Sequence, residues 1–148
     1  MDNLEKNKQN EKEKQYDLTL YSSFLFLINA IVAISYKYTL YSILFFFLFI
    51  TSILYRALNR NELLFMLDKF AILLVTIYGG YIFYSKFNNV SLYSSSFIIS
   101  TFLLTVFLFY YGYLTNTFCY DPDPSYSSAY HCLLHLVSCM GHNFIMVA

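Results

Sequence analysis

The sequence predicts an all-α protein, a polytopic transmembrane helical bundle of about five spans. Of its 148 residues, 58% are hydrophobic and only 12% are charged, which is too little polar surface to cover a fold in water. Half of the charged residues lie within the first 17 positions, and long runs without any charge fill most of the remainder. A helix needs about 20 apolar residues to cross the hydrocarbon core of a bilayer. These runs are continuous, whereas a membrane strand would alternate between apolar and polar residues.

The elements follow from these runs in chain order. Residues 1–17 mix four lysines with five acidic residues and predict a disordered polar tail, followed by a transmembrane helical domain over residues 18–148. We place the spans at Leu18–Ser35, Thr39–Arg56, Leu63–Tyr84, Ser91–Leu114 and Ser125–Met146. The last span has the clearest start, because the segment from Asp121 to Ser125 supplies capping oxygens and a proline suited to the first turn. The loops are too short for a soluble domain, so the function must lie within the bundle or at its rims.

Lysine and arginine in the short loops predict the orientation. With a cytoplasmic N-terminus, the inner side carries the four tail lysines plus Arg56, Arg60 and Lys69, while the outer side carries only Lys37 and Lys86. Seven against two favours the N-terminus in the cytoplasm.

The composition also predicts the partners. The net charge is zero, which excludes the basic surface typical of a nucleic-acid binder. We expect membrane lipids as partners and regard a homo-oligomer as possible. Three cysteines give no disulfide framework.

Ionisable residues within spans are costly, so each suggests a functional site. Asp68 lies near the start of the third span, and His131 and His135 lie in the fifth. On a helix, residues four apart share one face about 6 Å apart, as two ligands of one metal require. A third ligand would have to be Asp68 or His142.

The predicted topology brings further polar residues to the same rim. The second span ends there, and the third and fifth spans begin there. Ser52, Arg56, Asp68, His131 and His135 should therefore lie at comparable depth, and three helices could contribute to one polar pocket.

The order of these residues resembles the CREST superfamily, the seven-span membrane hydrolases and receptors that include alkaline ceramidases and the progestin and adipoQ receptors. That family has a Ser and, four residues later, a His at the end of its second span, an Asp in the third, and His-x-x-x-His in the last. This chain has Thr51-Ser-Ile-Leu-Tyr-Arg56, Leu67-Asp-Lys69 and Tyr130-His-Cys-Leu-Leu-His135. The resemblance implies a zinc-dependent hydrolase of lipid amides or esters, with His131 and His135 as zinc ligands and Ser52 and Asp68 in supporting catalytic roles.

The chain departs from the family pattern in two ways. Arg56 stands where the first His is expected, and an arginine cannot lose its proton to bind a metal. The chain also has about two spans fewer than seven.

Other interpretations stay open at this point. His131 and His135 could form hydrogen bonds between helices without a metal, or belong to a proton or ligand path. Asp68 could pair with Arg56 or Lys69. The chain would then be a non-catalytic multi-span protein that acts by packing, oligomerisation or pore formation.

Overall fold

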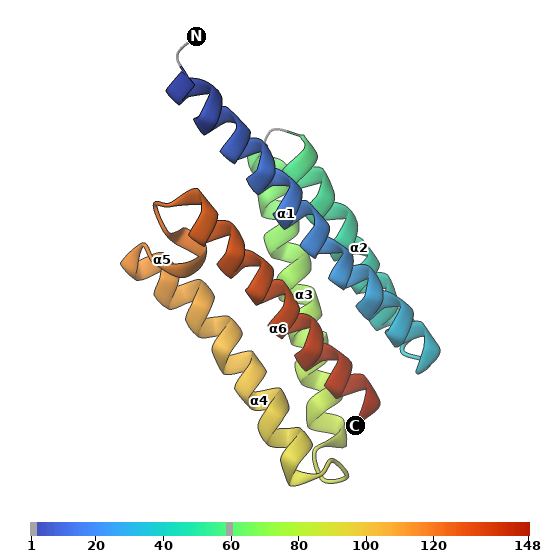
Figure 1. Cartoon of the computed structure of the whole chain (residues 1–148). Helices are drawn as coiled ribbons and strands as arrows, with labels where there is room; N and C mark the ends of the chain where they lie inside the picture. Colours follow the sequence, from blue (N-terminus) through green and yellow to red (C-terminus); the bar gives the residue numbers. More distant parts are fainter. Residues whose placement is uncertain (1–2, 59–60) are drawn as a thin grey trace.

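The fold of the chain is entirely helical in a computed structural model that describes residues 3–58 and 61–148, with side chains from residue 18 onward (Figure 1). The elements are α1 (Asn3–Ser35), α2 (Thr39–Ala57), α3 (Glu62–Lys86), α4 (Leu92–Val106), the π-helix η1 (Phe107–Tyr111), α5 (Gly112–Thr115), the 3-10 helix η2 (Phe118–Tyr120) and α6 (Pro124–Val147). Within these described ranges no residue is in a strand. The predicted all-α bundle is confirmed.

Four segments are long and apolar enough to cross a membrane: Leu18–Ser35 within α1, α2, α3, and the continuous segment Leu92–Thr115 that joins α4, η1 and α5. The predicted fifth span is present as the 24-residue helix α6, but it is not among these four. Its three histidines and Asn143 make it less apolar than the others. By length and composition, the described part of the chain therefore has four candidate spans and one long, more polar helix instead of five equivalent spans.

Helix α1 begins at Asn3, so its backbone continues from the first span into the segment that the sequence predicts to be a disordered tail. Glu, Lys and Gln, which dominate this segment, are good helix formers. Residues 1 and 2 and the side chains of residues 3–17 lie outside the described part of the structure, and the prediction of disorder stays a prediction.

Helix α6 packs between its neighbours α1, α3 and α4 (Figure 1). It runs parallel to α1, because Cys132 meets the carbonyl of Leu18 and Cys139, seven residues later, meets the carbonyl of Leu25. Helices α1, α2 and α3 form two successive antiparallel hairpins, whereas α4 packs on α6. Helix α6 is thus partly enclosed by the more apolar candidate spans, as expected where lipid cannot satisfy polar groups.

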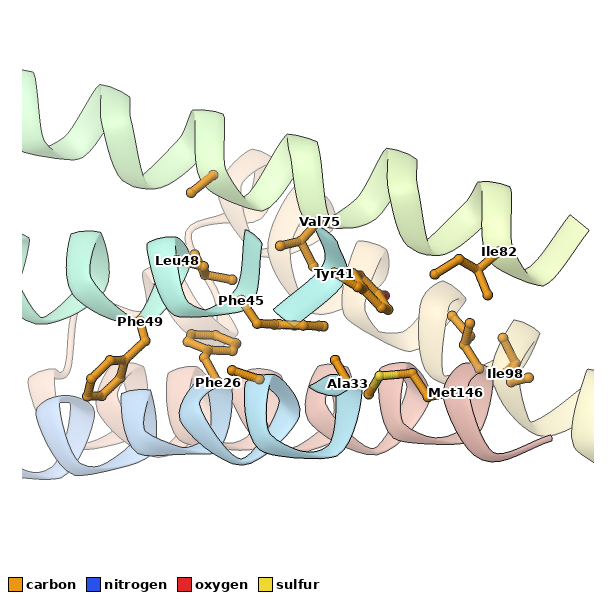
Figure 2. Close-up of a cluster of buried hydrophobic side chains, with 13 residues drawn as sticks. Phe26, Ala33, Tyr41, Phe45, Leu48, Phe49, Val75, Ile82, Ile98 and Met146 are labelled. Carbon is orange, nitrogen blue, oxygen red and sulfur yellow. The ribbon is translucent and has the colours of Figure 1, made fainter. Parts of the chain in front are cut away.

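The apolar core lies between α1, α2, α3 and the end of α6 (Figure 2). Tyr41 and Phe45 of α2 are fully buried at its centre, where they contact each other with ring centroids 4.6 Å apart. Val75 of α3 and Met146 of α6 close the cluster from two further sides. This core extends as far as Phe26, whose ring lies 4.8 Å from that of His135 on α6.

Gly79 of α3 permits the closest approach of helices in this core. A Cβ at this position would collide with the Tyr41 hydroxyl and lie 3.1 Å from the His142 ring. The neighbouring Gly80 has open space around its Cβ position. Only the first of the two adjacent glycines is therefore required for packing.

The Gly79→Ala variant should lower stability, because overpacking a tight contact costs about 1–3 kcal/mol. Gly80→Ala is the matched control and should be neutral or slightly stabilising, since alanine favours a helix over glycine by up to about 1 kcal/mol. Thermal unfolding in detergent, followed by circular dichroism at 222 nm, measures both. Equal melting temperatures for the two variants would contradict the assigned contact.

Candidate functional site

The five polar residues that the sequence places at one rim lie at one end of the bundle, where α2 ends and α3 and α6 begin. Ser52 of α2 donates a hydrogen bond to Oδ1 of Asp68 on α3 at 2.7 Å. Both side chains are buried, with 2% and 6% of their surface exposed. The predicted contact between the second and third spans is thus present, and it joins the two residues for which the CREST resemblance implies a catalytic role.

His135 of α6 is buried and uses both of its ring nitrogens. Its Nε2 lies 3.4 Å from Nη2 of Arg56, and its Nδ1 lies 2.8 Å from the hydroxyl of Ser22 on α1. A guanidinium can only donate hydrogen bonds, so Nε2 must be the acceptor and the ring proton must be on Nδ1. Nδ1–H then donates to Ser22, whose hydroxyl donates in turn to the carbonyl of Thr19 at 2.9 Å. Each bond in this sequence then has one donor and one acceptor, with His135 neutral.

Arg56 joins this sequence of bonds to the contact between Ser52 and Asp68. Its Nη1 donates to the carbonyl oxygen of Ser52, one turn earlier on α2, at 3.2 Å. One set of bonds therefore connects four helices, and we call it the Arg56 network: Asp68, Ser52, Arg56, His135, Ser22 and Thr19. The convergence expected for Ser52, Asp68 and His135 is observed, with α1 as an additional contributor.

His131 lies one turn before His135 on α6 and is half-buried. The two imidazole rings are 6.2 Å apart between centroids and perpendicular to each other. The structure thus brings both predicted zinc ligands to the same end of the bundle as Asp68 and Ser52.

The donor atoms in this arrangement do not suit a zinc ion. Within residues 18–58 and 61–148, no group of three or more His, Cys, Asp and Glu side chains could hold a metal. The Nε2 lone pair of His135 points to the Arg56 guanidinium, whose permanent positive charge would repel a dication. The assignment of His131 and His135 as zinc ligands stays a prediction. In this structure the Arg56 guanidinium occupies the position next to Nε2 of His135 that a zinc ion would need.

His142 belongs to a separate cluster, although the sequence places it on the same stripe of α6. Its Nδ1 is hydrogen-bonded to the hydroxyl of Tyr41 on α2, and its ring meets the edge of Phe45 at a centroid distance of 5.2 Å. Because α6 rises about 1.5 Å per residue, His142 is roughly 10 Å further along the helix than His135. It contributes to packing against α2 and α3 instead of to the Arg56 network.

A third polar contact lies between these two and was not predicted. Asn29 of α1 is completely buried, and its Oδ1 accepts a hydrogen bond from the thiol of Cys139 at 3.1 Å. The thiol sulfur lies 3.6 Å from the amide nitrogen of Asn143. The sequence does hold a signal for this contact, because Asn29 is the only carboxamide in the apolar run from Leu18 to Tyr36.

Cys119, in η2 outside the spans, is buried, and this burial raises the pKa of its thiol to about 11 despite the nearby Lys69 ammonium. The thiol therefore stays protonated at neutral pH and is a poor nucleophile. It offers no alternative catalytic centre near the network.

Comparisons of the chain with protein-family models, with curated proteins and with solved structures give no match. The resemblance to the CREST superfamily accordingly rests on the residues quoted above.

The Ser22→Ala variant should destabilise the protein, because it leaves the buried Nδ1–H of His135 without an acceptor. Such an unsatisfied donor costs about 1–3 kcal/mol. Ser23→Ala is the control, since Ser23 is more deeply buried than the half-buried Ser22 but bonds only within its own helix, to the carbonyl of Thr19. Denaturant unfolding in detergent measures both variants, and a loss for Ser23→Ala that equals or exceeds the loss for Ser22→Ala would overturn the bonding scheme.

Proposed function

We propose that this chain is a multi-pass membrane protein without hydrolytic activity, in which the Arg56 network joins the helices where a CREST-like enzyme would hold its metal. The observation that carries the proposal is the 3.4 Å contact between Nη2 of Arg56 and Nε2 of His135. The guanidinium donates to the nitrogen lone pair that a zinc ion would need. The protein is, on this proposal, a non-catalytic relative of CREST-like hydrolases.

The hydrogen bonds around Ser52 also argue against covalent catalysis. A serine nucleophile needs a base within hydrogen-bonding reach that is itself held in place by a third group. The hydroxyl of Ser52 donates to Asp68, whereas the ring of His135 bonds to Arg56 and Ser22. Ser52 and His135 are thus engaged with different partners, and Ser52 is only 2% exposed, which leaves a substrate little access to it.

The same bonds support a structural role. A buried charge is expensive, and it is tolerated when several acceptors surround it in a fixed geometry. Two acceptors come from different helices, the Ser52 carbonyl on α2 and His135 on α6. Since Ser52 also bonds to Asp68 on α3 and His135 bonds to Ser22 on α1, the Arg56 network joins four helices.

The direction of the helices agrees with the membrane orientation proposed from the sequence. Helices α1, α3 and α6 run in the same direction (Figure 1). If all five long helices cross the membrane, these three begin on the side of the N-terminal segment. With the N-terminus cytoplasmic, the Arg56 network lies toward the cytoplasmic leaflet.

Metal analysis tests the proposal. The purified wild-type protein, equilibrated with zinc and dialysed, should retain well below one zinc per chain. The Arg56→His variant should gain zinc toward one per chain, because it places a third imidazole next to His135. The variant with Arg56→His, His131→Ala and His135→Ala is the control and should lose that gain.

Stoichiometric zinc in the wild type that is lost on replacing His131 and His135 by Ala would contradict the proposal. So would hydrolysis of a lipid amide or ester by the purified wild type that is abolished by Ser52→Ala and Asp68→Asn. Either result would support the alternative of a metal-dependent hydrolase.

A further inference from the structure

Lys69 places a cation among aromatic rings at the same end of the bundle. It follows Asp68 on α3, and its side chain is half-buried. The ammonium lies 4.5 Å from the ring centroid of Phe109 in η1 and 5.2 Å from that of Phe65, one turn earlier on α3. Two aromatic rings thus attract the charge.

The ring faces leave the three N–H groups of this ammonium without oxygen acceptors. Between residues 18 and 148, apart from residues 59 and 60, the structure gives Lys69 these two ring contacts but no hydrogen bond and no ion pair. The neighbouring carboxylate of Asp68 accepts from Ser52 in the interior. By contrast, Lys86, at the opposite end of α3, donates to the carbonyls of Ile145 and Met146. An ammonium at a membrane rim needs such acceptors.

Aromatic residues continue on both sides of Lys69 and supply hydroxyl groups. The ring of Phe65 packs on Tyr55 of α2 at 5.6 Å, and the ring of Phe109 packs on Tyr120 of η2 at 5.5 Å. Tyr120 in turn meets Tyr113 of α5 at 5.3 Å. We call these five side chains the aromatic arc: Tyr55, Phe65, Phe109, Tyr120 and Tyr113.

The chemistry of the aromatic arc suits an anion with several oxygens. Burial raises the pKa of Tyr120 to about 12, so its phenol keeps its proton and can donate to an acceptor. Phe109 belongs to the π-helical turn Phe107–Tyr111, and such turns occur frequently at functional sites. Large side chains on the same elements are exposed on the surface, among them Met66 and Phe70 on α3 and Tyr110 on η1.

We propose that Lys69 and the tyrosines of the aromatic arc bind the phosphate of an anionic phospholipid in the adjacent leaflet. The phosphate oxygens would accept from the Lys69 ammonium and the phenols, while the acyl chains lie on the exposed apolar side chains of α3 and η1. The choline cation of phosphatidylcholine would be repelled by Lys69 and the nearby Arg56. Phosphatidylglycerol has no cation in its headgroup and should therefore bind better. This inference is independent of whether the protein has hydrolytic activity.

Native mass spectrometry of the full-length protein tests the site with lipid added to detergent micelles. The wild type should bind one dioleoylphosphatidylglycerol about tenfold more tightly than dioleoylphosphatidylcholine, and Lys69→Gln should lose that preference. Lys69→Arg keeps the charge and should keep the preference. Lys37→Gln is the matched control, because Lys37 is an exposed lysine at the opposite rim, and it should bind as the wild type does.

Three results would overturn the proposal. The first is equal binding of the two lipids by the wild type, a measurement that needs no variant and so cannot reflect a folding defect. The second is a Lys69→Gln variant that is folded by circular dichroism and keeps the preference of the wild type. The third is displacement of the lipid by inorganic phosphate at millimolar concentration, which would assign the site to free phosphate instead of a headgroup.

Discussion

The hydrogen bond between Arg56 and His135 is the contact on which the polar end of the bundle depends. It places a permanent charge beside a neutral imidazole and thereby fixes the side on which that imidazole carries its proton. The orientation of His135 then determines the bond to Ser22 on α1. Nη1 of the guanidinium donates to the carbonyl of Ser52, and the hydroxyl of Ser52 donates to Asp68. Removing the guanidinium would leave Nε2 of the buried His135 without its donor and would separate the bonds on α1 and α6 from those on α2 and α3.

Helix α6 makes polar contacts with neighbouring helices at several positions along its length. It is more polar than the four candidate spans, and three of its polar residues meet a specific partner on another helix. His135 meets Ser22 and Arg56, Cys139 meets Asn29, and His142 meets Tyr41. At its end, Lys86 donates to the last carbonyls, which a helix terminus otherwise leaves unpaired. In a medium that offers no hydrogen bonds, such contacts position a helix more specifically than apolar packing does.

The sequence predicts the elements well, because charge marks where helices leave the membrane. The predicted spans Thr39–Arg56 and Leu63–Tyr84 agree with α2 and α3 to within two residues at each end. The convergence of Ser52, Asp68 and His135 also follows from counting spans, since alternate helices start at the same face. The contribution of Ser22 could not be predicted, because a serine in an apolar run most often serves close packing. His142 lies apart from the Arg56 network because it packs against Tyr41 and Phe45 of α2. The periodicity of α6 alone does not show which helices surround it.

The coupling between Arg56 and His135 is the most direct test of this account. Unfolding free energies of the wild type, Arg56→Met, His135→Leu and the double variant, measured in the same detergent, form a double-mutant cycle. We expect a coupling of about 1–3 kcal/mol, with the double variant less destabilised than the sum of the single variants, because each single change removes one hydrogen-bond partner from the polar group that remains. Additive effects within about 0.3 kcal/mol would contradict the claim that this contact organises the site.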